Sequence, residues 1–111
     1  MKEVKEGFFE LLTTHCAGAN YGAWKDQLDD LAFGTVLRAV REPSNEYDRN
    51  AIRLDAPDGS KVGYVPAVQA VWLCRMMDLG GYELLAEVVT VESYRSMVAI
   101  SICMPKAPED L

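Results

Sequence analysis

The side chains with the most chemistry in this sequence lie in residues 41–52, REPSNEYDRNAI, a polar stretch between two apolar runs. Its arginines can pair with phosphates or carboxylates, its carboxylates can accept hydrogen bonds from hydroxyl groups, and its tyrosine offers a flat ring for stacking. Turn formation explains part of this polarity and accounts well for three residues: Pro43, Asn45 and Asn50. A turn requires neither an aromatic ring nor a second carboxylate. Tyr47 and Asp48 are therefore left as candidates for binding.

Patterns of catalytic and metal-binding residues are absent from the sequence. It contains no HExxH, GxSxG, P-loop or dinucleotide-binding glycine pattern. His15 is adjacent to Cys16, but neighbours on a strand point to opposite faces, which does not suit a nucleophile and its base. The three cysteines lack CxxC spacing and are expected to be buried, reduced thiols: Cys16, Cys74 and Cys103. We therefore expect a non-enzyme without metal or cofactor. A small metal-dependent hydrolase, supported only by His15 and scattered acids, is the weakest alternative.

The elements that must position these side chains are mostly β-strands. β-compatible residues bounded by turn signals favour strands in six ranges: 10–22, 35–42, 50–56, 60–66, 82–91 and 97–104. The Pro-Asp-Gly at 57–59 predicts a hairpin, because Pro presets φ and Gly accepts a positive φ. Residues 24–34 are typical of a short helical turn or loop that ends at Gly34.

Residues 66–81 carry the one clear helical pattern. Pro66 suits a first helical turn, and Gly80–Gly81 suit a left-handed stop. Five apolar residues at i, i+3, i+4, i+8 and i+11 share one face: Val68, Val71, Trp72, Met76 and Leu79. This face could be a binding stripe, but packing against a sheet is the more common use of such a face. We expect it to lie in the core.

Together these elements predict a mainly β fold with one or two α-helices. The architecture we expect is a small OB-like antiparallel β-barrel of five or six strands, with an SH3-like barrel as the other candidate. A chain of 111 residues has the length of one domain, which we place at residues 8–104. Residues 1–7 and 105–111 have little to bury and are expected to be flexible termini.

The formal net charge of −6 restricts the partners. An acidic protein is repelled by polyanions at long range, which argues against a broad electrostatic grip on duplex DNA. Salt confines this repulsion to about 8 Å, so a small local site for a polyanion is still compatible. No apolar run suits a membrane span, and the N-terminal residues do not form a secretory signal, so we expect a cytoplasmic location. The sequence leaves the oligomeric state open.

Two motifs resemble the signature of the HIRAN domain family. Residues 45–52 (NEYDRNAI) match its Asn-x-Tyr-Asp-x-Asn-Ala-Ile run, and residues 62–66 (VGYVP) match the Val-Gly-aromatic-hydrophobic-Pro that follows a hairpin. AGANYG at 17–22 is similar to an upstream element, so the resemblance covers residues 10–104. It implies a modified OB-like barrel with one or two helices. Family members occur at the N-terminus of Swi/Snf-type DNA-dependent ATPases of fork repair, whose ATP hydrolysis lies in separate helicase-like domains. They also occur as free-standing bacterial and phage proteins, which this length suggests.

The resemblance implies a reader of the 3′ end of single-stranded DNA. In that role Tyr47 and Tyr21 stack on terminal bases, and Asp48 accepts a hydrogen bond from the 3′-hydroxyl. Three further residues belong to the implied site. Asn45 lies in the turn that frames the pocket, Tyr64 lies at its rim, and Asn20 falls where an arginine can occur in the family. Basic residues that grip DNA in the family are replaced here by uncharged ones: Asn20, Ala67 and Val68. The cations expected in their place lie beside the motif or nearby: Arg41, Arg49, Lys61 and Arg38.

A protein–protein adaptor that uses an exposed strand edge is the alternative function, and in it the motif would serve only the fold. The net charge favours the adaptor, whereas the tyrosines and Asp48 favour DNA. In the DNA-binding case a helicase or another repair protein is a candidate partner, and a membrane is not.

Overall fold

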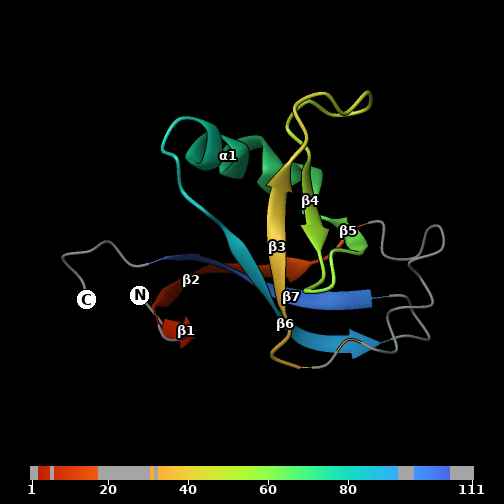
Figure 1. Ribbon diagram of the computed structural model, residues 1–111, viewed down its shortest axis with the longest axis vertical. Helices are drawn as coiled ribbons and strands as arrows, with labels where there is room; N and C mark the ends of the chain where they lie inside the picture. Colours follow the sequence, from red (N-terminus) through yellow and green to blue (C-terminus); the bar gives the residue numbers. More distant parts are fainter. Residues whose placement is uncertain (1–2, 6, 18–30, 32, 93–96, 106–111) are drawn as a thin grey trace.

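The computed structural model describes residues 3–5, 7–17, 31, 33–92 and 97–105, which form one antiparallel sheet and one helix (Figure 1). The elements follow the chain in this order: β1 (Glu3–Lys5), β2 (Phe8–His15), β3 (Val36–Arg41), β4 (Ile52–Asp55), β5 (Lys61–Tyr64), α1 (Ala67–Asp78), β6 (Leu85–Glu92) and β7 (Met97–Pro105). The seven strands lie in the order β1-β2-β7-β6-β3-β4-β5. The fold is therefore mainly β, as the sequence predicts.

The sheet is curved towards a barrel. Register shifts interrupt the pairing of β2 with β7 and of β6 with β7, and such irregularities bend strands and increase their twist. The far edge, β5, then meets the chain just after β2 through an isolated antiparallel bridge between Ala17 and Tyr64. Two backbone hydrogen bonds make this bridge, Ala17 N–H to Tyr64 O at 2.7 Å and Tyr64 N–H to Ala17 O at 2.8 Å. The OB-like expectation is consistent with this nearly closed sheet.

The core lies between the curved sheet and α1. Its largest fully buried side chains are aliphatic and come from four of the strands, from α1 and from the residue before β6: Leu37, Ile52, Leu54, Leu73, Leu84, Val88, Val98, Ile100 and Ile102. In β7 the apolar residues alternate as predicted, with Val98, Ile100 and Ile102 at 0–2% exposure. This core fixes the framework on which the loop between β3 and β4 stands.

The predicted hairpin and strands are present among the described residues, although residues 18–22 of the first predicted strand lie outside them, and one strand is additional. Gly59 has φ 90° in the turn between β4 and β5, as the Pro-Asp-Gly signal predicts, and Asp58 Oδ1 accepts the Ser60 N–H at 2.8 Å. The additional strand β1 lies inside residues 1–7, the expected flexible end. Its backbone pairs with β2 in the register Glu3 to Phe9, and Gly7 between them has φ 85°.

The helix forms where the sequence predicts it, but its predicted buried face is wrong. The side chains that α1 buries are Ala70, Leu73 and Cys74. Four of the five residues of the predicted face are exposed: Val68 at 73%, Val71 at 45%, Trp72 at 44% and Leu79 at 86%. Only Met76 packs partly against the core. The residues that α1 buries lie on the opposite side of the helix, and Leu73 and Cys74 belong to the hydrophobic core.

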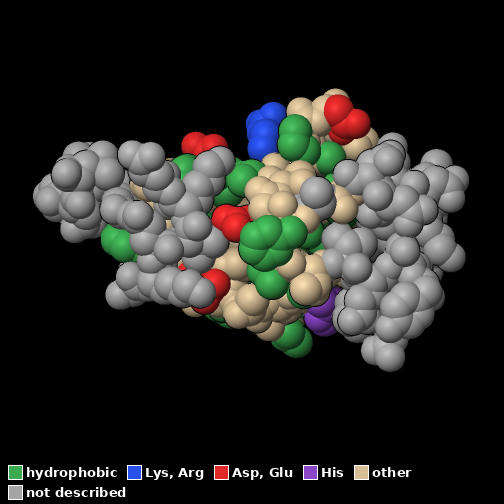
Figure 2. Space-filling model, turned by 90° about the horizontal axis from the view of Figure 1, so that it is seen from below, with side chains coloured by type: hydrophobic (Ala, Val, Ile, Leu, Met, Phe, Trp, Pro, Cys, Tyr) green, Lys and Arg blue, Asp and Glu red, His purple; other side chains and the backbone are tan. Residues whose placement is uncertain are grey.

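The surface of the described residues carries no broad basic region on the face shown in Figure 2. There acidic side chains are spread over the surface, while Lys and Arg gather at one edge. No helix among the described residues is both long and apolar enough to span a membrane. Most of the turn or loop predicted at 24–34 lies outside the described residues.

Candidate functional site

The motif loop, which we define as residues 42–51, connects β3 to β4 and is held by its own side chains. Asn45 Oδ1 accepts the backbone N–H of Tyr47 at 2.9 Å and of Asp48 at 3.0 Å. Asp48 Oδ1 accepts the Asn50 N–H at 2.8 Å, and the Ala51 N–H donates to Asp48 O at 3.0 Å. These are the turns that Asn and Asp side chains favour. The loop is therefore shaped from within, and the Tyr47 ring is left without a part in the turn.

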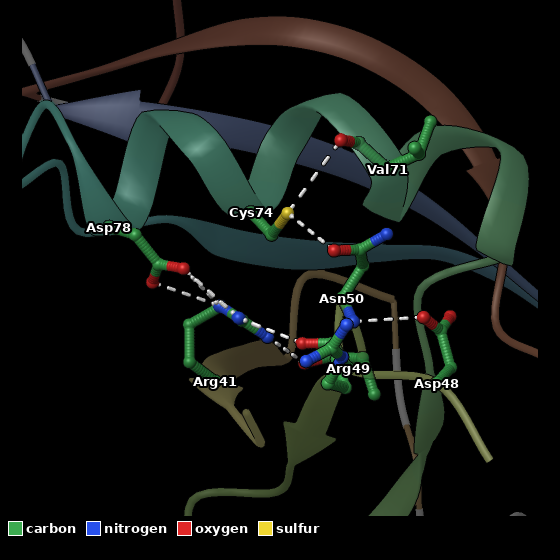
Figure 3. A network of polar contacts seen from close by, with 8 residues as sticks. Arg41, Asp48, Arg49, Asn50, Val71, Cys74 and Asp78 are labelled. Atoms are coloured by element: carbon green, nitrogen blue, oxygen red, sulfur yellow. Dashed lines mark hydrogen bonds and ion pairs between the residues drawn. The ribbon is translucent and has the colours of Figure 1, made fainter. Parts of the chain in front are cut away.

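Helix α1 lies along the motif loop and is joined to the end of β3 at one point and to the loop at another (Figure 3). At the C-terminal end of the helix, Arg41 forms an ion pair with Asp78, with 2.9 Å between Nε and Oδ1. In the middle, the Cys74 thiol donates to Asn50 Oδ1 at 3.5 Å. These contacts fix the loop to the helix, because both partners of each contact stand on ordered backbone.

Arg41 and Arg49, the cations expected at a phosphate, have different surroundings. Besides Asp78, the Arg41 guanidinium donates to Ala51 O at 2.6 Å and Arg49 O at 3.0 Å. Its side chain is 14% exposed and does not line the pocket described below, so Arg41 holds the loop. The Arg49 side chain is exposed on the same loop and is also not part of the pocket lining.

A pocket of about 410 Å³ opens beside the motif loop. Nine residues line it: Ala17, Asn45, Tyr47, Asp48, Ala51, Lys61, Tyr64, Val65 and Ala67. The structure thus brings together four residues of the site predicted from the sequence, from the motif loop and from β5. The Tyr47 side chain stands at its edge with 90% of its surface exposed. Asn20 and Tyr21 lie outside the described residues.

The opposite wall of the pocket carries a cation. Lys61 Nζ lies 4.5 Å from the centre of the Tyr64 ring, within the range of a cation–π contact. The pocket also reaches Val65 and Ala67 at the N-terminal end of α1, where no described side chain caps the helix and no acid stands in its first turn. An uncapped helix N-terminus presents free N–H groups and the positive end of the helix dipole. The pocket therefore combines an aromatic ring, a carboxylate and positive charge.

Behind the pocket, Glu42 joins three elements. Its Oε1 accepts hydrogen bonds from the Tyr64 hydroxyl at 2.9 Å and from Asn45 Nδ2 at 3.1 Å, and its Oε2 accepts one from Arg53 Nη1 at 2.9 Å. Burial by itself raises the pKa of the Glu42 carboxyl, but the hydrogen bonds from Asn45, Tyr64 and Arg53 and the Arg53 charge outweigh it and hold the pKa below its ordinary value. Sequence reasoning missed Glu42. The signal that could have found it is the pairing of Arg53 with Tyr64 across the β4–β5 hairpin. Using this signal requires the register of the hairpin.

The residues considered for catalysis do not form a nucleophile and base. His15 is exposed and Cys16 is 4% exposed, so the two neighbours face opposite sides, as expected for a strand. Burial raises the pKa of the Cys16 thiol to about 12, against a smaller lowering by a hydrogen bond with the Tyr64 backbone. At neutral pH this thiol is protonated and is a poor nucleophile.

Three comparisons relate the chain to known proteins. The family model for the HIRAN domain matches residues 9–104. A search of curated proteins finds no match. Among solved structures, a protein from Lactobacillus plantarum is 24% identical, with a TM-score of 0.82 over 90% of this chain and 97% of that one. The crystal structure of the HIRAN domain of human HLTF is 20% identical, with a TM-score of 0.71 over 96% and 85%. The NMR structure of the HLTF HIRAN domain gives 18% and 0.66 over 95% and 84%. At these identities the structures support the fold.

Proposed function

The chain belongs to the HIRAN domain family, and from this premise we propose that it is a non-catalytic module that binds single-stranded DNA, preferably at a 3′-hydroxyl end. The observation that carries the proposal is the convergence of Tyr47, Asp48, Tyr64 and Lys61 on one pocket. A role in DNA repair or replication, with a helicase or another repair protein as partner, is the context in which we expect such a module to act.

Stacking of bases on tyrosine rings supplies the affinity in this proposal. The Tyr47 ring stands exposed at the mouth of the pocket, with its backbone held by Asn45. An ordered backbone below a free aromatic ring suits a stacking platform, because little freedom remains to be lost on binding. Tyr21 stays the second stacking ring in the proposal by its place in the sequence motif.

Asp48 supplies the preference for a 3′-hydroxyl. Its Oδ1 is used by the Asn50 N–H, and among the described residues Oδ2 accepts no hydrogen bond. A carboxylate can accept a hydrogen bond from a terminal hydroxyl but repels a phosphate. A strand that ends in the pocket is therefore favoured over one that continues through it.

Phosphate groups of the bound strand would meet the positive side of the pocket. Lys61 and the N-terminal end of α1 lie at its wall, and Arg49 projects from the motif loop. Arg41 no longer belongs to this set, because its guanidinium is engaged with Asp78 and two carbonyl oxygens. The logarithm of the binding constant should fall linearly with the logarithm of the salt concentration, with a slope of about −0.7 per phosphate neutralised on a single strand. Because the cations are few, few phosphates are neutralised.

Fluorescence anisotropy at low salt tests the proposal. Two labelled single strands of equal sequence are compared, one with a 3′-hydroxyl and one with a 3′-phosphate. We expect the wild type to prefer the hydroxyl and Asp48→Asn to lose the preference, because Asn keeps an oxygen for the Asn50 N–H but removes the charge. Equal binding of both strands by the wild type, or binding of neither, would refute the proposal.

A protein-interaction module is the second candidate function. The apolar face of α1, with Val68, Trp72 and Leu79 exposed, is an observation that favours it. In this case neither single strand binds, and substitution of Asp48 has no effect on the partner.

A further inference from the structure

We propose that Glu42 is a positioning residue of the pocket, which sets the place of Tyr64 and of Asn45 and thereby the distance between the two sides of the pocket. The inference rests on the proposed function for its effect on DNA binding. Glu42 itself is not part of the pocket lining, so it acts through its neighbours.

One carboxylate oxygen joins the two walls. Glu42 Oε1 holds the Tyr64 hydroxyl from β5 at 2.9 Å and the Asn45 amide from the motif loop at 3.1 Å. Tyr64 is 22 positions away from Glu42 in the sequence, whereas Asn45 is three positions away. A single acceptor shared by two donors fixes the separation between them, because each donor must stay within hydrogen-bond distance of the same atom.

The effect of Glu42 extends to Tyr47 and Asp48 through the other end of Asn45. While Asn45 Nδ2 donates to Glu42, its Oδ1 accepts the backbone N–H groups of Tyr47 and Asp48. The amide side chain is planar, so its two ends move together. A shift of the Glu42 carboxylate therefore shifts the residues that we propose to contact the base and the hydroxyl.

The Glu42 carboxylate is itself fixed from β4. Arg53 Nη1 donates to Glu42 Oε2 at 2.9 Å, and the same guanidinium donates through Nε and Nη2 to both oxygens of Asp55 at 2.8 and 3.0 Å. The Asp55 side chain is 10% exposed, and β4 pairs with strands on both sides. The planar guanidinium allows little rotation once two oxygens hold it. Asp55 on β4 thus holds Arg53, Arg53 holds Glu42, and Glu42 holds two residues that line the pocket.

If Glu42 acted only through its negative charge, its removal would have the opposite effect on DNA binding. Removal of one negative charge from a protein of net charge −6 should strengthen the binding of a polyanion. Glu46 provides the matched control, because it is an exposed carboxylate on the same motif loop and makes no hydrogen bond through its side chain to the residues described. We expect Glu46→Ala to bind a 3′-hydroxyl strand as well as the wild type or more tightly. Glu42→Ala is expected to bind about tenfold more weakly, the effect of losing hydrogen bonds donated to a charged acceptor.

A double-mutant cycle and an NMR measurement separate positioning from a loss of folding. In the Tyr64→Phe background no hydroxyl is left for Glu42 to hold, so Glu42→Ala should weaken binding less than in the wild type. Without DNA, the ring signals of Tyr64 should shift in Glu42→Ala, while those of Tyr82, beyond the far end of α1, should not. The NMR result decides the positioning role even if the wild type binds no DNA. Unchanged Tyr64 signals, or equal weakening in both backgrounds, would overturn the inference.

Discussion

The guanidinium of Arg41 and the carboxylate of Asp78 form a two-pronged ion pair although 37 positions separate them in the sequence. Nε lies 2.9 Å from Oδ1, and Nη2 lies 3.0 Å from Oδ2. The pair joins the end of β3 to the last residue of α1. The other N–H groups of the guanidinium hold the carbonyls of Arg49 and Ala51. One side chain thus orders the motif loop and fixes it to the helix that borders the pocket.

Arg41→Ala should lower the free energy of unfolding by about 1–3 kcal/mol, because it removes the ion pair with Asp78 and the hydrogen bonds to the carbonyls of Arg49 and Ala51. Urea unfolding measures the loss. Arg41→Lys should not restore the stability, since a single ammonium cannot reproduce the planar fork. Arg49→Ala is the control and should change the stability by no more than about 0.5 kcal/mol. Equal losses in Arg41→Ala and Arg49→Ala would contradict the structural role of Arg41.

Tyr47→Ala should weaken single-strand binding by about 1–3 kcal/mol, the contribution of one stacked base. Because the ring is exposed and takes no part in the loop's turns, the unfolding midpoint should stay where it is. Anisotropy titrations and urea curves on the same samples check both parts. Tyr47→Phe keeps the stacking surface and should bind like the wild type. If Phe is as weak as Ala, the hydroxyl and not the ring face carries the contact.

The two faces of α1 should respond differently to truncation. Leu73 is fully buried, and Leu73→Ala should cost about 2–5 kcal/mol of unfolding free energy. Val68 is 73% exposed, and Val68→Ala should change it by no more than about 0.5 kcal/mol. Chemical unfolding of the two variants compares them directly. The reverse order would mean that the face predicted from the sequence is the buried one after all.

Local chemistry in the sequence predicted most of the fold and part of the site. The glycine of Pro-Asp-Gly accepts a positive φ, and Asn45 and Asp48 accept backbone N–H groups, because each signal acts within a few residues. The burial of the helix could not be predicted in the same way. Periodicity detects an apolar face, but α1 carries apolar residues on both sides, and which side is buried depends on how the helix packs in the fold, which here buries Ala70, Leu73 and Cys74.

Long-range contacts decide the roles of the charged residues near the motif, and these contacts were not visible in the sequence. Arg41 beside an asparagine- and aspartate-rich loop suits a phosphate ligand as well as a structural ion pair. Its pairing with Asp78 depends on how α1 packs over the loop. Glu42 likewise meets Tyr64 only when β5 pairs with β4 in the observed register. Tyr47 and Asp48 line one pocket in the structure, because they lie within a single loop.

The Cys16 thiol should resist alkylation in the folded protein. Burial raises its pKa to about 12, so the reactive thiolate is scarce at pH 8, and the side chain is also 4% exposed. Iodoacetamide followed by mass spectrometry measures the labelling. We expect Cys16 to be labelled only after denaturant is added. Rapid labelling of Cys16 in native buffer would show that this end of β2 opens readily.

Glu42 should make the stability depend on pH in one direction. Its pKa is lowered in the folded protein, so its contribution is fully present above the pKa that it has when unfolded and is lost as the pH falls through its folded-state pKa. Wild type and Glu42→Gln are compared by urea unfolding from neutral to acid pH. The wild type should be more stable at neutral pH, and the two curves should converge on acidification. Curves that stay parallel would exclude a contribution from this carboxylate.

The bridge between Ala17 and Tyr64 is made by main-chain atoms alone, and this has a consequence for how such a protein can change over evolutionary time. Main-chain hydrogen bonds do not depend on which side chains stand at the two positions. A substitution at position 64 can therefore change a side chain that lines the pocket while β5 stays joined to the chain after β2. At this position the main-chain atoms hold the fold together, and the side chain is free to vary without breaking the bridge.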